Sequence, residues 1–111
     1  MKSQKKHAKA FSFEFFPPKT AEGKEKLRAT WKQLGQLGPK FFSCTFGAGG
    51  STREGTLETV LEIRAAGYEA APHLSCVAST RADLVAQLEK YKSHGIRHVV
   101  ALRGDLPSGL A

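Results

Sequence analysis

The chain has 111 residues, enough for one domain with a hydrophobic core, and 41% of them are hydrophobic. Its 17 basic and 10 acidic residues give a net charge of +7, but Lys2, Lys5, Lys6 and Lys9 all precede the first expected strand. We therefore expect residues 1–10 to form a basic, disordered tail. The tail lacks the interleaved aromatic residues of single-strand binders, so nucleic acid is not an expected partner.

The apolar segments and the cysteine and histidine positions indicate where the protein resides and which kinds of site it can contain. No stretch is long and apolar enough to span a bilayer, and no apolar signal-peptide segment precedes residue 11, so we expect a cytoplasmic protein without a membrane partner. Cys44 and Cys76 are expected to be free, buried thiols, although the sequence leaves a bridge between neighbouring strands open. His73 and Cys76 could ligate a metal, but no second pair has ligand spacing, and we predict no metal site.

The first expected strand lies in residues 11–19, which have the sequence FSFEFFPPK. Alternation places most of its aromatic rings on one face and Glu14 on the other, and Pro17 and Pro18 end the strand. Glu14 is therefore expected at the carboxyl end, facing inward. Rings leave a carboxylate little water, which favours its protonated form and a role as a proton donor. The alternative is an ion pair between Glu14 and a lysine or arginine.

Strand and helix patterns alternate along the rest of the chain. Helices are predicted to begin after Thr20, within residues 51–54, which have capping-box spacing, and after Thr80, which has Asp83 three residues on. Further strands are predicted at 41–46, 70–76 and 98–102. The apolar helix stripes are Leu27, Trp31 and Leu34; Leu57, Val60, Leu61 and Ile63; and Leu84, Leu88 and Tyr91. The first helix is expected to end near Gly35 or at Gly38 and Pro39, and the others near Gly67 and Gly95.

These strands begin about 30 residues apart with a helix in each gap, which is the pattern of βαβ units. Two architectures fit, a small doubly wound sheet and part of a (β/α)8 TIM barrel. The inward residues near the strand ends are polar, which favours the barrel because its active site forms at the carboxyl face. We predict that the chain covers about the first four strands and three helices of such a barrel. The open sheet edges predict a homo-oligomer. The inward polar residues are Ser12, Glu14, Ser43, Thr45, His73 and Ser75.

Four groups of candidate functional residues follow successive strands: Glu14, the glycine-rich loop 45–50, His73, and residues 103–105. The loop precedes a helix N-terminus, where an anion can bind, but alone it is a weak signal and a simple tight turn is the better explanation. His73 could stack on or hydrogen-bond to a planar ligand, or be a core histidine satisfied by the backbone. Residues 103 and 105 could simply pair with each other.

Four motifs in this order resemble the N-terminal half of methylenetetrahydrofolate reductase: FSFEFFPPK at 11–19, TFGAGGSTR at 45–53, PHLSC at 72–76 and ALRGDLP at 101–107. The resemblance covers residues 11–109. It implies a flavin-dependent (β/α)8 barrel that passes a hydride from NADH or NADPH to FAD and then to 5,10-methylenetetrahydrofolate, forming 5-methyltetrahydrofolate. The choice between NADH and NADPH stays open.

The resemblance also assigns roles to individual positions. Glu14 matches the general acid that protonates the folate, and Asp105 matches a residue beside the flavin that also contacts the folate. Thr45 matches a position near the nicotinamide. The remaining FAD-contacting positions are matched by Phe46, Ala48, His73, Arg103 and Gly104.

Family members continue through four more βα units. The resemblance therefore implies that this chain is a fragment of a reductase and is inactive alone. The alternative is a catalytically silent half-barrel that associates with itself through its open sheet edges.

Overall fold

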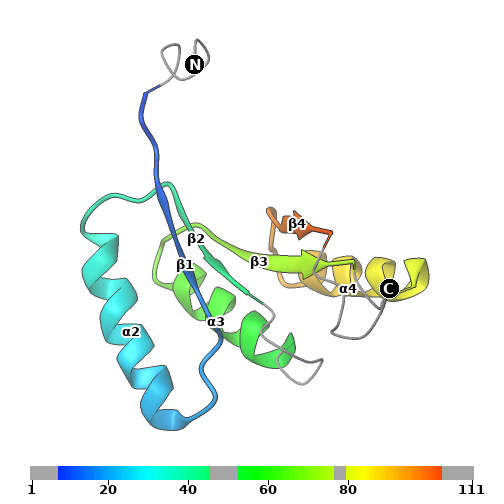
Figure 1. Ribbon diagram of the computed structural model, residues 1–111, viewed down its shortest axis with the longest axis horizontal. Helices are drawn as coiled ribbons and strands as arrows, with labels where there is room; N and C mark the ends of the chain where they lie inside the picture. The colour runs from blue at the N-terminus through cyan, green and yellow to red at the C-terminus, as the bar shows by residue number, and fades with distance from the viewer. Residues whose placement is uncertain (1–7, 46–52, 77–79, 104–111) are drawn as a thin grey trace, which may run out of the picture.

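The computed structural model of the chain describes residues 8–45, 53–76 and 80–103. Within these residues, strands and helices alternate in the predicted order (Figure 1). The elements are β1 (Ser12–Phe15), α2 (Ala21–Gly35), β2 (Phe41–Cys44), α3 (Arg53–Ala65), β3 (Ala70–Ser75), α4 (Arg81–Ser93) and β4 (Val100–Leu102).

All the described strand pairs are parallel, and the strands lie in the order β1-β2-β3-β4. In Figure 1 they fan out in chain order, with α2 beside β1 and α4 beside β3 and β4. Right-handed crossovers that always step in one direction place the helices on one face of the sheet, whereas a doubly wound sheet reverses its order. The arrangement is a parallel α/β sheet compatible with the start of a TIM barrel.

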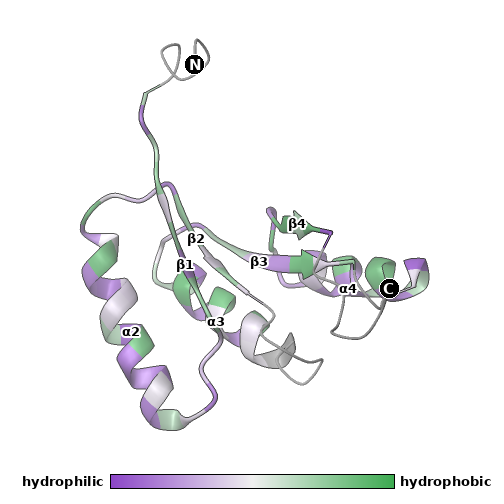
Figure 2. Cartoon of the chain, in the orientation of Figure 1, coloured by the Kyte–Doolittle hydropathy of each residue, from purple (hydrophilic) through white to green (hydrophobic). Residues whose placement is uncertain are grey.

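The hydrophobic core lies between the sheet and the three helices. Phe42 on β2 is fully buried, and the Phe15 ring stacks on it with centroids 5.5 Å apart. Tyr68 meets Phe42 edge-on at 5.6 Å and Trp31 of α2 at 6.2 Å. In Figure 2 the helices carry both purple, hydrophilic and green, hydrophobic residues, as expected of helices with one side towards a core. The buried core residues are Trp31, Phe42, Cys44, Leu57, Val60, Ile63, Ala70, Leu74, Tyr91 and Ile96.

Local sequence signals place most helix ends correctly. Thr20 caps α2 by accepting from the Gly23 N–H at 2.9 Å, and Thr80 and Asp83 form the predicted capping box. Gly67 and Gly95 follow α3 and α4 with φ of +97° and +80°, values that glycine adopts without strain. Residues 51 and 52 of the capping box predicted at 51–54 lie outside the described residues, so that box stays a prediction.

Two predictions about α4 and β4 were wrong. Leu88 is 41% exposed, because Leu84 and Tyr91 provide the contacts of α4 with the core. β4 begins at Val100 rather than at 98, since it is an edge strand that pairs only along His73–Ser75 of β3. No helix in the described part of the chain is long and apolar enough to cross a membrane.

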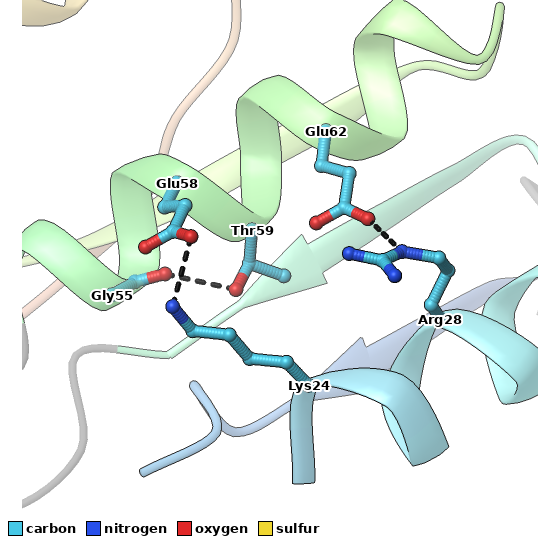
Figure 3. Close-up of polar contacts among 6 residues, drawn as sticks. All are labelled: Lys24, Arg28, Gly55, Glu58, Thr59 and Glu62. Atoms are coloured by element: carbon cyan, nitrogen blue, oxygen red, sulfur yellow. Dashed lines mark hydrogen bonds and ion pairs between the residues drawn. The ribbon is translucent and has the colours of Figure 1, made fainter. Parts of the chain in front are cut away.

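Ion pairs join α2 to α3 outside the core (Figure 3). Lys24 pairs with Glu58 at 2.9 Å, and the Arg28 guanidinium donates to Glu62 one turn further along. Exposed pairs of this kind contribute less than about 1 kcal/mol each. They lie along the contact between α2 and α3.

Candidate functional site

Polar side chains from three neighbouring strands gather on the sheet face opposite the hydrophobic core, which we call the polar face. Glu14 on β1 lies in register with Ser43 on β2. Cys44 and Pro72 are register partners on β2 and β3, and Thr45 and His73 are the next residues along the chain. They therefore lie at the same height in the sheet. The polar face is defined by Glu14, Ser43, Thr45 and His73, all near the carboxyl ends of their strands.

His73 is the centre of this group. Its side chain is almost fully buried, and its Nε2 lies 3.0 Å from the Ser43 Oγ and 3.3 Å from the Glu14 Oε1. Burial lowers the pKa of His73 below its ordinary value, and the Glu14 carboxylate opposes part of that shift. Both partners of Nε2 are side chains. The alternative prediction, a core histidine whose ring is satisfied by the backbone, is therefore wrong for this nitrogen.

The other ring nitrogen of His73 has a different environment. Nδ1 is buried and receives no hydrogen bond from any described residue. Leaving a buried polar atom unpaired costs free energy, about 1–3 kcal/mol, so such atoms usually mark a place where a ligand or water binds. His73 can therefore hold Glu14 and Ser43 with one nitrogen and a ligand with the other.

Glu14 reaches the predicted position but not the predicted environment. Its side chain is 59% exposed, so the expectation of a carboxylate deprived of water is wrong for the described residues. The reason is that β1 lies at the edge of the described sheet, where β2 is its one neighbouring strand. Among the residues that the structure describes, the basic group beside Glu14 is His73 rather than a lysine or arginine.

The backbone of Thr45 is fixed on both sides. Its N–H donates to the Phe15 carbonyl at 2.9 Å, and its own carbonyl accepts from the Thr56 Oγ1 at 2.7 Å. Its hydroxyl Oγ1 is buried and has no hydrogen-bond partner among the described residues. With His73 Nδ1, this hydroxyl gives the carboxyl end of the sheet two polar atoms without a partner among the described residues, and a polar ligand could satisfy them.

Half of the predicted site can be placed on the structure. Arg103 is exposed and follows β4. Phe46, Ala48, Gly104 and Asp105 lie outside the described residues, so the predicted pairing of residues 103 and 105 stays a prediction.

The cysteines and the metal prediction can also be compared with the structure. Cys44 and Cys76 are both free. Cys44 is buried as expected, and burial raises its pKa to about 12, whereas Cys76 is exposed because it lies just past the end of β3. Within residues 8–45, 53–76 and 80–103, no cluster of three or more potential metal ligands exists.

Sequence reasoning missed the contact that Ser43 makes. Ser43 was predicted only as an inward polar residue, because its meeting with His73 depends on the register of β2 against β3. The available signal was the alignment of the first two strands. They pair in parallel from equivalent positions, so Ser43 lies opposite Glu14.

A hollow of about 360 Å³ lies at the opposite, amino end of the same sheet region. It includes neither Glu14 nor His73, so it is separate from the site described above. Its lining residues are Lys40, Phe41, Glu69, Ala71, His98, Val99 and Val100.

Comparisons with known proteins agree with the geometry. The family model described as methylenetetrahydrofolate reductase matches residues 1–111. The chain is 48% identical over 99 residues to 5,10-methylenetetrahydrofolate reductase of Salmonella typhimurium and 46% identical to that of Escherichia coli, covering 88% of this chain and 33% of each relative. It is 45% identical to methylenetetrahydrofolate reductase (NADH) 1 of Arabidopsis thaliana, covering 90% of this chain and 17% of that protein. The chain thus spans about a third of the length of its bacterial relatives.

Proposed function

Since the chain belongs to the methylenetetrahydrofolate reductase family, we propose that residues 11–111 form the first four strands and three helices of a (β/α)8 barrel that reduces 5,10-methylenetetrahydrofolate. The observation that carries this proposal is the meeting of Glu14, Ser43 and His73 on the polar face at the carboxyl ends of the strands. In a barrel this end of the sheet forms the active site. Residues 1–10 are proposed to be a basic tail outside the catalytic unit.

FAD is the proposed cofactor, with NADH or NADPH as the hydride donor. A bound flavin would accept the hydride and deliver it to the folate, and the residues of this chain would hold it in place. The unsatisfied Nδ1 of His73 fits a contact with a polar ring. The hydroxyl of Thr45, at the same level of the sheet, would face the nicotinamide. Phe46, Ala48, Arg103, Gly104 and Asp105 are proposed to complete the cofactor site, with Asp105 also contacting the folate.

Glu14 is the proposed proton donor to the folate. Its side chain projects from the polar face beside His73, and its exposure leaves it accessible to a substrate. His73 Nε2 can donate a hydrogen bond to the carboxylate that remains after the proton has left, which stabilises the ionised form. A donor of this kind is needed only for the folate, so hydride transfer to the flavin does not require Glu14.

A chimera tests this proposal. The segment of this chain that matches the Salmonella typhimurium relative would replace the corresponding segment of that protein. We expect the chimera to oxidise NADH with menadione and to reduce 5,10-methylenetetrahydrofolate. Glu14→Gln should retain the menadione reaction and lose the folate reaction. A folded chimera without either reaction would overturn the proposed function, and unchanged folate reduction by Glu14→Gln would overturn the role of Glu14.

The 111-residue chain alone is proposed to be inactive and cytoplasmic, without a nucleic-acid or membrane partner. Purified chain should therefore show no NADH oxidation with menadione.

A second candidate, a silent protein that self-associates, is favoured by one observation: β1 and β4 are the edges of the described sheet. Unpaired strand edges favour pairing with another copy. A discrete dimer on a sizing column would support such a homo-oligomer, and a monomer would argue against it.

A further inference from the structure

We propose that Ser43 is a positioning residue that holds His73 and thereby controls the protonation of Glu14. The inference rests on the proposed function of Glu14 as a proton donor. Ser43 has no role in the family resemblance described above, and it does not need to touch the substrate or the cofactor to act in this way.

The first observation is how Glu14 and His73 reach each other. They lie on β1 and β3, which are separated by β2 and are therefore roughly 10 Å apart. Their side chains nevertheless bring Oε1 and Nε2 within 3.3 Å. They meet above Ser43, which is buried on the intervening strand and has one of the smallest side chains. A larger residue at this position would occupy the space in which the two side chains meet.

The second observation is that one nitrogen has two oxygen neighbours. His73 Nε2 lies 3.0 Å from the Ser43 Oγ and 3.3 Å from the Glu14 Oε1. A neutral imidazole carries a single N–H, and if that proton were on Nδ1, the Nε2 lone pair would face the Glu14 carboxylate. Repulsion between them therefore favours the tautomer with the proton on Nε2. Burial favours the neutral ring at neutral pH, because it lowers the pKa of His73.

Ser43 and Glu14 then compete for the same N–H. When Glu14 is ionised, its carboxylate is the stronger acceptor and receives the bond. When Glu14 carries its proton, the Ser43 hydroxyl is the better acceptor and keeps the N–H satisfied. Ser43 thus stabilises the state in which Glu14 is ready to donate, and His73 stabilises the state after donation.

The described neighbours of His73 leave few other groups that could produce this effect. Glu14 is the charged group that acts on His73 from β1. The neighbour on β2 is Ser43, and the register partner of His73 on β4 is Val100. Neither of these side chains ionises in the pH range of the titration. The other sheet face packs against the helices through apolar residues.

The test follows the carboxyl carbon of Glu14 by ¹³C NMR during a pH titration of the 111-residue chain, with Glu14→Gln to assign the signal. Ser43→Ala should move the Glu14 titration to lower pH by roughly half a unit to one unit, which corresponds to the net free energy of one hydrogen bond. His73→Phe should move it to higher pH, because the ionised state loses its donor.

Opposite shifts in Ser43→Ala and His73→Phe are the signature of the competition, because a merely structural role would not produce them. No shift in Ser43→Ala, or a shift to higher pH, would overturn the proposal. The imidazole ¹⁵N signals of His73 give a second measurement in the unmodified sequence: protonation of Nε2 at neutral pH supports the proposal and protonation of Nδ1 overturns it. Neither readout depends on catalysis, so this inference and the proposed function can fail separately.

Discussion

The Thr56 hydroxyl donates a hydrogen bond of 2.7 Å to the main-chain carbonyl of Thr45, which joins the first turns of α3 to the carboxyl end of β2. These two residues lie on either side of the glycine-rich segment 46–52. Thr56 is fully buried, and Thr45 is also held by its N–H bond to Phe15. The chain is therefore held in place just before and just after the predicted cofactor loop. The Thr56 side chain contributes to both of these attachments.

Thr56→Val should destabilise the fold, because the Thr45 carbonyl then loses the hydrogen bond and the side chain keeps its shape. We expect a loss of about 1–3 kcal/mol in the free energy of unfolding, measured with urea. Thr59→Val is the matched control, since the Thr59 hydroxyl bonds to Gly55 within the same helix (Figure 3) and should contribute less. Equal losses in both variants would contradict the account of the Thr45–Thr56 link.

Two glycine substitutions should have opposite effects on stability. A Cβ at Gly35 would lie 2.5 Å from the Tyr68 ring, which cannot move freely because it packs against Trp31 and Phe42. Gly35→Ala should therefore cost about 1–3 kcal/mol. At Gly55 the nearest atom is the Pro17 Cβ at 3.4 Å, and alanine should raise stability by up to about 1 kcal/mol through helix propensity. Thermal unfolding of both variants checks the signs, and a stabilised Gly35→Ala would show that Tyr68 is not fixed.

The two cysteines should differ in reactivity. Burial raises the pKa of Cys44 to about 12, so its thiolate is scarce at neutral pH, whereas Cys76 is exposed. Iodoacetamide at pH 7.5 should modify Cys76 and leave Cys44 unmodified in the folded chain. Mass spectrometry of Cys76→Ser should then show no label until denaturant is added. Rapid labelling of native Cys76→Ser would contradict the burial of Cys44.

Stability should fall on mild acidification because of His73. Its pKa is lowered in the folded chain, so below its ordinary value of 6.5 the unfolded chain binds more protons than the folded one. The stabilising contribution of neutral His73 is thus fully present above pH 6.5 and is lost as the pH falls towards the folded-state pKa. His73→Phe should show a smaller decrease in melting temperature between pH 7 and pH 5 than the unmodified chain. An unchanged decrease would assign the effect to other groups.

Local signals in the sequence were sufficient for the helix ends and the order of elements. Thr20, Thr80 and Asp83 cap their helices through residues at most three positions away, so no tertiary information was needed. The βα spacing likewise determined the parallel sheet, because right-handed crossovers leave few alternatives. The motifs that resemble the reductase family led to the family that the comparisons show.

What the sequence did not predict depends on which strands are neighbours and in what register. Alternation predicted the face on which Glu14 lies, but not its exposure, which follows from the edge position of β1. Helical periodicity predicted that Leu84 and Leu88 would both face the core. In the structure Leu84 packs against the core, whereas Leu88 is exposed. The contact of Ser43 with His73 spans 30 residues and is set by the pairing of β2 with β3.

The most direct test of the central claim is a fluorescence titration of FAD against the chimera that carries this segment, with and without His73→Phe. The account predicts saturable binding that the substitution weakens roughly tenfold, because Nδ1 of His73 then no longer meets the flavin. Thr59→Val, away from the polar face, should leave the affinity unchanged. A folded chimera that binds no FAD, or one whose affinity His73→Phe does not change, would contradict the assignment of the polar face as the flavin site.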